Sequence, residues 1–213
     1  MKHLPSVAIR RCLIPALVLP LLAGCTSLFE AKPDTTRFFL LTAPARVAAP
    51  AADAARTVTV GLKRIELPAY LNTPAIVLRP GGTELRHASQ ARWAEALELG
   101  IARVLKESLQ AQPPVRSVVA YPAPEAELPA FEVSVTVRAC EGLTGPAGRQ
   151  MRFAAMWEIR STAPSAVAAA PVAAGNFESA PADWAEGDYA TLTAKLGEAV
   201  AALGRELAAA LPK

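Results

Sequence analysis

The chain has 213 residues, of which 52% are hydrophobic and 19% are charged. A chain of this length can bury the core of one ordinary domain, so it needs neither disulfides nor a structural metal for stability. Its formal charge of +3 at pH 7 comes from Lys2, Arg10 and Arg11 near the N-terminus. The remaining chain has equal numbers of positive and negative residues, which argues against a nucleic-acid-binding protein or a polybasic membrane-binding surface.

Residues 1–24 have the three parts of a secretory signal peptide. A basic start precedes an apolar run over 13–23, and small residues then lead to Cys25. The apolar run is shorter than the roughly 20 residues of a transmembrane helix, and Pro15 and Pro20 interrupt it. The sequence therefore predicts a cleaved signal peptide over residues 1–24.

The signal ends in Leu-Ala-Gly-Cys, which resembles the lipobox at which bacteria acylate a cysteine and cut just before it. We expect Cys25 to be lipidated, because a thiol can carry a thioether-linked diacylglycerol. Its acyl chains would hold the protein in a bilayer at about 0.8 kcal/mol per buried CH₂, and residues 25–36 would form a lipidated tether. Thr26 replaces the Asp that favours inner-membrane retention in similar lipoproteins, which points to the outer membrane. The alternative is an ordinary signal peptide with a coincidental Cys25.

The other cysteines predict no disulfide. Cys12 would leave with the signal and Cys25 would be acylated, so Cys140 has no partner within the chain. We expect a small, semi-buried structural residue there, with an intermolecular or redox role as the alternative.

The first strands are predicted before residue 63. Residues 38–41 form an apolar cluster typical of a short strand, and the alanine-rich and proline-rich stretch 44–56 predicts a loop. Val58, Val60 and Leu62 then alternate with small or polar residues, the pattern of a strand with one buried face.

Pro68 and Pro74 bracket the next segment. A proline cannot donate to a sheet ladder and fixes its own φ, so these two residues should anchor an ordered loop. Tyr70 and Leu71 are large apolar residues within that loop. We expect them to pack onto the body of the protein or onto a partner.

A β-hairpin and a helix should follow. Ile76, Val77 and Leu78 predict a short strand, and residues 80–82 a glycine turn to a partner strand over 83–86. Ser89 is placed to cap a helix. The apolar stripe of that helix would be Trp93, Leu97, Ile101, Val104, Leu105 and Leu109. Trp93 and Leu97 are expected to be core anchors.

Residues 115–121 predict another short strand. Residues 131–138 and 152–160 alternate apolar and polar side chains and predict an antiparallel hairpin around a turn over 142–148, with a weaker strand over 172–179. The segment 188–211 predicts a long helix, weakened at Gly197 and Gly204. Its apolar stripe is Leu192, Leu196, Val200, Leu203 and Leu207. The fold class is therefore α+β, one domain over 37–211 with a largely antiparallel sheet and two amphipathic helices on one face.

The run I-E-L-P-A-Y-L-N-T-P-A-I-V-L-R, followed by R-W-A-E-A-L-E, resembles the ABC-type transport auxiliary lipoprotein family. The likeness is specific over 65–98 and weaker after residue 109. It implies a lipoprotein that serves an inner-membrane transporter and a periplasmic protein with mammalian-cell-entry (MCE) domains. It also implies that copies of the chain can assemble into rings.

The sequence offers little chemistry for an enzyme. His87 is the only histidine left after processing, and no second ligand lies at metal-binding spacing. Ser89 lies near His87, but the chain has no G-x-S-x-G motif, and Gly81-Gly82 lacks the Lys-Ser/Thr of a phosphate loop. We expect no catalytic, metal or cofactor site.

The expected function is thus that of a non-enzymatic lipoprotein of the outer membrane that faces the periplasm and docks on the MCE protein of a lipid transport system. The candidate docking residues are Tyr70, Leu71, Ile76, Val77 and Leu78, since loops on a rigid scaffold often carry binding. Tyr70 and Leu71 could equally well cap the core. Two alternatives remain: a lipoprotein that itself binds a lipid or other hydrophobic solute, and a structural envelope lipoprotein without a transport partner.

Overall fold

Strand β6 (Phe131–Leu143) is the centre of the sheet in the computed structural model, which describes residues 33–42, 57–123, 128–145, 148–163 and 170–212. β7 (Gln150–Ser161) pairs with it antiparallel along its whole length, from Phe131 opposite Ser161 to Leu143 opposite Gln150. The alternate valines of β6 are buried, as the period-2 pattern predicts. The predicted hairpin is confirmed, but its strands are longer than predicted because Gly142 still pairs with Met151.

Two strands pair in parallel with the other edge of β6. β2 (Val58–Leu62) lies along its start and β3 (Ala75–Gly81) along its end. The outer strands add to these: β1 (Arg37–Phe39) and β4 (Glu84–Trp93) beyond β3, β5 (Val115–Ala120) beyond β2, and β8 (Ala173–Glu178) and β9 (Ala182–Asp183) beyond β7. The nine-stranded sheet is therefore mixed, although its antiparallel pairs contain most of the paired residues.

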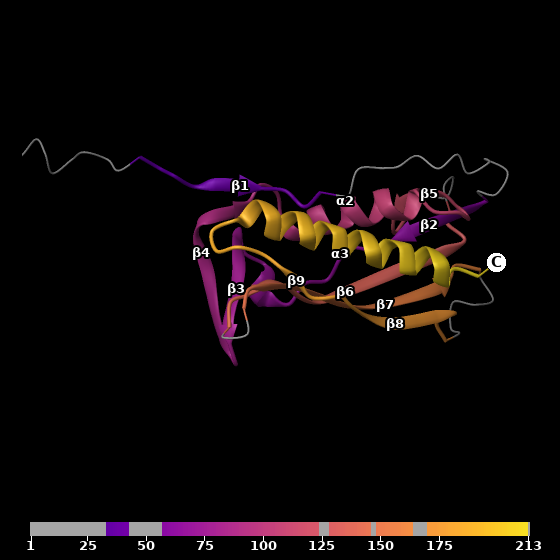
Figure 1. Cartoon of the computed structure of the whole chain (residues 1–213). Helices are drawn as coiled ribbons and strands as arrows, with labels where there is room; N and C mark the ends of the chain where they lie inside the picture. The colour runs from indigo at the N-terminus through magenta and orange to yellow at the C-terminus, as the bar shows by residue number, and fades with distance from the viewer. Residues whose placement is uncertain (1–32, 43–56, 124–127, 146–147, 164–169, 213) are drawn as a thin grey trace, which may run out of the picture. The chain divides into compact units, whose positions relative to one another are not determined.

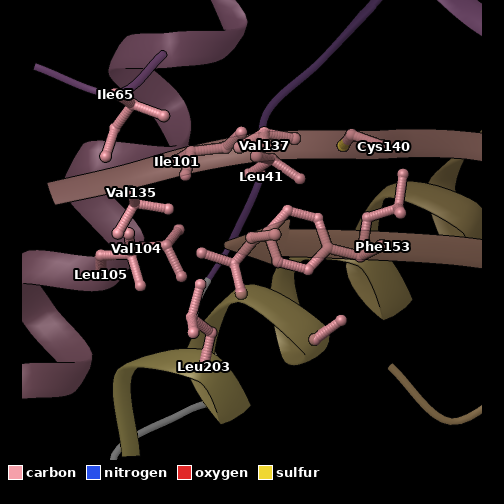
Figure 2. Packing of buried hydrophobic residues seen from close by; sticks show 14 of the residues in the cluster. Leu41, Ile65, Ile101, Val104, Leu105, Val135, Val137, Cys140, Phe153 and Leu203 are labelled. Carbon is pink, nitrogen blue, oxygen red and sulfur yellow. The ribbon is translucent and has the colours of Figure 1, made fainter. Parts of the chain in front are cut away.

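Helices α2 (Leu97–Gln110) and α3 (Tyr189–Ala210) pack against each other and lie on one face of the sheet (Figure 1). Their predicted apolar residues from Leu97 and Leu192 onward are all buried. Figure 2 shows how Val104 and Leu105 of α2 meet Leu203 of α3 and the inward face of β6. This confirms the α+β fold with two amphipathic helices on one face.

The beginning of α2 differs from the prediction. Ser89 and Trp93 belong to strand β4, and α2 is preceded by Ala96, whose side chain makes no capping hydrogen bond. The predicted cap at Ser89 was wrong because β4 continues past it: Arg92 pairs with Ala75 and with Phe38, and Trp93 N donates to Pro74 O at 2.7 Å. Trp93 is nevertheless buried, with 6% of its surface exposed, so it is a core anchor at a strand end.

The two glycines of α3 are sites of close packing. A Cβ at Gly204 would lie 2.6 Å from Ser108 Cβ of α2, and one at Gly197 would overlap the backbone of Thr42. The prediction that they only weaken the helix was therefore incomplete. They allow α2 and residue 42 to approach α3 more closely than any side chain would permit.

Residues 36–213 form one compact unit, and residues 1–35 are assigned to another. The predicted signal peptide, Cys25, most of the tether and the loop over 44–56 lie outside the described residues. Among the described residues, no helix combines the length and apolar character that a membrane span requires.

Candidate docking surface

The loop between Pro68 and Pro74 is ordered, as its prolines predict. Pro68 has a φ of −63° and precedes a short 3-10 helix, η3 (Ala69–Leu71). Leu71 N donates to Pro68 O at 2.9 Å, and Asn72 N donates to Ala69 O at 3.1 Å. The loop is thus held by its own backbone hydrogen bonds, and the bond from Trp93 to Pro74 O ties its end to β4.

The five predicted docking residues are divided between core and surface. Leu71, Ile76 and Val77 are at most 2% exposed and belong to the hydrophobic core. They present almost no surface to a partner in the folded chain, although Leu71 lies at the bottom of a groove described below. Tyr70 and Leu78 are half-buried, so they are the two that the structure leaves in reach of solvent.

Tyr70 belongs to a polar cluster of four residues, Tyr70, Arg79, Arg138 and Glu141, which we call the Tyr70 cluster. Tyr70 Oη donates to Arg138 O of β6 at 2.9 Å, and the Arg79 guanidinium lies 6.0 Å from the centre of the Tyr70 ring. Arg79 Nε and Nη2 donate to the two carboxylate oxygens of Glu141 at 2.7 and 3.1 Å. The cluster therefore fastens the loop and the hairpin of β3 and β4 to the central strand.

Burial and neighbouring charges shift the pKa values of side chains in and beside the Tyr70 cluster. Burial, and then the Glu141 carboxylate, raise the pKa of the Tyr70 phenol. The hydrogen bond to Glu141 raises the pKa of the Arg79 guanidinium. Burial raises the pKa of the neighbouring Cys140 thiol to about 12. At neutral pH the tyrosine and the cysteine are therefore neutral, and Arg79 is a permanent cation.

A groove of about 380 Å³ runs between the loop and the start of α2; we call it the loop groove. Leu71 and Trp93 are among the residues that line it, and Asn72, Pro74 and Ala94 are exposed beside it. The groove thus offers a largely apolar depression between the hydrogen-bonded loop and the first turn of α2.

The carboxylates near the groove are already paired. Arg103 Nη2 donates to Glu95 Oε1 at 2.6 Å, and Arg64 Nη2 donates to Glu98 Oε1 at 2.7 Å. Leu97 is buried at the start of α2 between these two acids, as predicted. The rim of the loop groove is therefore neutral, which suits a protein partner better than a charged small molecule.

Sequence patterns could not identify the Tyr70 cluster or the loop groove as units. Arg79 and Glu141 are 62 residues apart, and no local spacing links them. Ala94 carries no chemical signal at all. His87 and Ser89 are exposed on β4, Cys140 is buried in β6, and the described residues contain no group of three or more His, Cys, Asp or Glu side chains that could hold a metal ion.

The chain was compared with known protein families and with curated proteins. The family model described as "ABC-type transport auxiliary lipoprotein component" matches residues 39–208. No curated protein matches the chain.

Solved structures share the fold. A protein of the DUF330 family from Xanthomonas campestris is 16% identical, with a TM-score of 0.65 over 81% of this chain and 93% of that one. An uncharacterized protein is 14% identical, with a TM-score of 0.62 over 82% of this chain and 97% of that one. The PelC dodecamer from Paraburkholderia phytofirmans is 12% identical, with a TM-score of 0.45 over 75% of this chain and 92% of that one.

Proposed function

Because the chain belongs to the ABC-type transport auxiliary lipoprotein component family, we propose that it is a non-enzymatic subunit that docks on the periplasmic MCE-domain protein of an intermembrane lipid transport system. In this proposal the acylated Cys25 anchors the chain in the outer membrane and the domain faces the periplasm. The inner-membrane transporter completes the system, and further copies of the chain assemble with it.

The observation that carries the docking proposal is the rigidity of the loop and of its groove. A docking surface loses least entropy when its backbone is fixed before binding. Here the loop has internal hydrogen bonds, and the two-point contact of Arg79 with Glu141 holds the adjoining hairpin. The exposed residues Asn72, Pro74 and Ala94 then offer a surface of defined shape to a partner.

The anchoring proposal rests on the sequence and the family. The lipobox ends at Cys25, and Thr26 follows it. A lipoprotein with several acyl chains is held in one membrane far more firmly than a protein with a single chain. The match to a family of transport auxiliary lipoproteins supports a lipid anchor at Cys25.

The test is co-purification from cross-linked cells that carry a C-terminally tagged chain. Ala94→Arg places a long cation at the edge of the loop groove without changing a buried residue. Ala174→Arg, on the exposed face of β8, is the matched control. We expect the wild type and Ala174→Arg to recover an MCE-domain protein and Ala94→Arg to lose it.

The opposite results would separate the proposals. Recovery of the MCE-domain protein by Ala94→Arg at wild-type levels would exclude the loop groove as the docking surface. If the tagged wild-type chain recovers only further copies of itself, docking on an MCE-domain protein is contradicted. That result would favour the two alternatives, a solute-binding lipoprotein or a structural envelope lipoprotein.

A further inference from the structure

A second groove lies where α2 passes the C-terminal ends of β2 and β5. It has a volume of about 380 Å³, and we call it the α2 groove. Its lining includes the apolar side chains of Leu62, Ala102 and Val118 and the ring of Tyr121. Ala102, whose side chain is a single methyl group, lies on the α2 side of the groove.

The rim of the α2 groove is basic. Lys63 and Arg64 follow β2, while Arg103 and Lys106 belong to α2. The first three are partly neutralised, because Lys63 pairs with Glu132, Arg64 with Glu98, and Arg103 with Glu95. The fourth cation, Lys106, is not neutralised in this way.

Lys106 is exposed and makes no ion pair with any described residue. Lys63 Nζ, which is paired with Glu132, also lies 5.8 Å from the centre of the Tyr121 ring. No acidic residue is among those that line the α2 groove. The site therefore combines an apolar floor with one rim cation, Lys106, that has no ion-pair partner among the described residues.

We propose that the α2 groove binds the acyl chain of an anionic single-chain lipid, with the carboxylate of the lipid beside Lys106. An acyl chain gains about 0.8 kcal/mol for each CH₂ that leaves water, and the apolar floor provides that environment. Lys106 selects an acid over a neutral amphiphile, because an ion pair at the edge of a low-dielectric surface is stronger than one in bulk water.

This site is separate from the loop groove and requires no partner protein. The two grooves have no lining residue in common. A lipid in the α2 groove would leave the docking surface free, so this inference goes beyond the proposed function and can fail or succeed without it.

The test measures fatty-acid binding by the mature chain. The Cys25→Ser form, exported behind a cleavable signal, needs no detergent that would compete for the groove. Palmitate should displace a fluorescent polyene fatty acid from it saturably, at one molecule per chain. We expect Lys106→Glu to weaken palmitate binding about fivefold or more, the scale of a partly exposed ion pair, while binding of the neutral hexadecanol changes less than twofold.

Two further variants complete the test. Arg205→Glu reverses an exposed cation on α3 and should leave palmitate binding unchanged. Ala102→Phe fills the hollow and should weaken both palmitate and hexadecanol, while the unfolding midpoint shows that the chain still folds. The proposal is overturned if palmitate binding does not saturate, or if Lys106→Glu and Arg205→Glu weaken it equally.

Discussion

Arg79 and Glu141 form a two-point ion pair between β3 and β6, with donor to acceptor distances of 2.7 and 3.1 Å. The Glu141 side chain has no exposed surface, whereas 24% of the Arg79 side chain is exposed. A buried carboxylate depends on its partner, because water cannot replace a lost counter-charge. This pair fixes the hairpin beside the proposed docking surface.

Arg79→Met should therefore destabilise the domain by roughly 3–5 kcal/mol, the cost of leaving a buried charge without its partner. Urea unfolding followed by tryptophan fluorescence measures this free energy. The matched control is Arg152→Met, which breaks an exposed ion pair with Glu178 and should cost at most about 1 kcal/mol. Equal losses in the two variants would show that the buried pair contributes no more than a surface one.

Gly204→Ala should destabilise the domain although alanine is the better helix former. Helix propensity alone would favour the alanine by about 1 kcal/mol. The added Cβ would lie 2.6 Å from Ser108 Cβ, so α2 and α3 must separate, which costs typically 1–3 kcal/mol. We expect a lower unfolding midpoint.

Gly100→Ala on α2 is the control for that experiment. Its added Cβ would meet Glu95 Oε1 at 3.1 Å, the end of a partly exposed side chain that can shift slightly while it stays paired with Arg103. This variant should be neutral or slightly more stable. Equal stabilisation of both variants would contradict the close packing of the helices at Gly204.

Cys140 should make the stability of the domain fall in alkaline solution. Burial raises the pKa of its thiol from 9.0 to about 12 in the folded state. Because the pKa is higher in the folded state, the neutral thiol makes its full contribution to the free energy of unfolding below the unfolded-state pKa. That contribution is lost as the pH rises from about 9 to 12. Comparing the pH dependence of unfolding in the wild type and Cys140→Ala isolates this contribution from Tyr70 and Tyr189, whose pKa values burial also raises.

The same burial predicts that the Cys140 thiol is inert. In the Cys25→Ser mature chain, maleimide should label Cys140 only as fast as the domain unfolds, and urea should accelerate the reaction. Rapid labelling of the native protein at pH 7 would contradict the burial of this side chain.

The proposed acylation of Cys25 has a direct chemical readout. Mass spectrometry of the purified mature protein should find an N-terminal cysteine that carries a diacylglycerol and an amide-linked acyl chain. The protein should sediment with the outer membrane, and Cys25→Ser should not. A mature N-terminus elsewhere, without lipid, would instead support an ordinary signal peptide.

Local patterns predicted those elements whose residues are close together in the chain. The alternation in β6 and the apolar stripe of α3 follow from periods of 2 and 3.6, and both were confirmed. Ser89 misled the prediction because a capping residue is a weak local signal, and the pairing of β4 with β1 and β3 outweighs it. The parallel pairing of β2 and β3 with β6 joins distant segments, so no local pattern could reveal it.

In the candidate site, too, local patterns predicted some features, while others depend on contacts between distant segments. Pro68 and Pro74 predicted an ordered loop, because a proline restricts the backbone wherever it stands. The burial of Leu71 and the ion pair of Arg79 with Glu141 depend on which strands meet, and so only the folded chain displays them. The sequence could not indicate the proposed role of Ala94, because that role depends on the position of Ala94 beside the loop groove and not on the chemistry of its side chain.

The proposed docking on an MCE-domain protein is the central claim, and site-specific photo-cross-linking in living cells tests it most directly. A photoreactive amino acid at position 94, beside the loop groove, is compared with the same residue at position 174 on β8. We predict that the adduct from position 94 contains an MCE-domain protein and that the adduct from position 174 does not. If position 94 yields no adduct with such a protein while the chain is present at normal levels in the outer membrane, the proposed docking surface is contradicted.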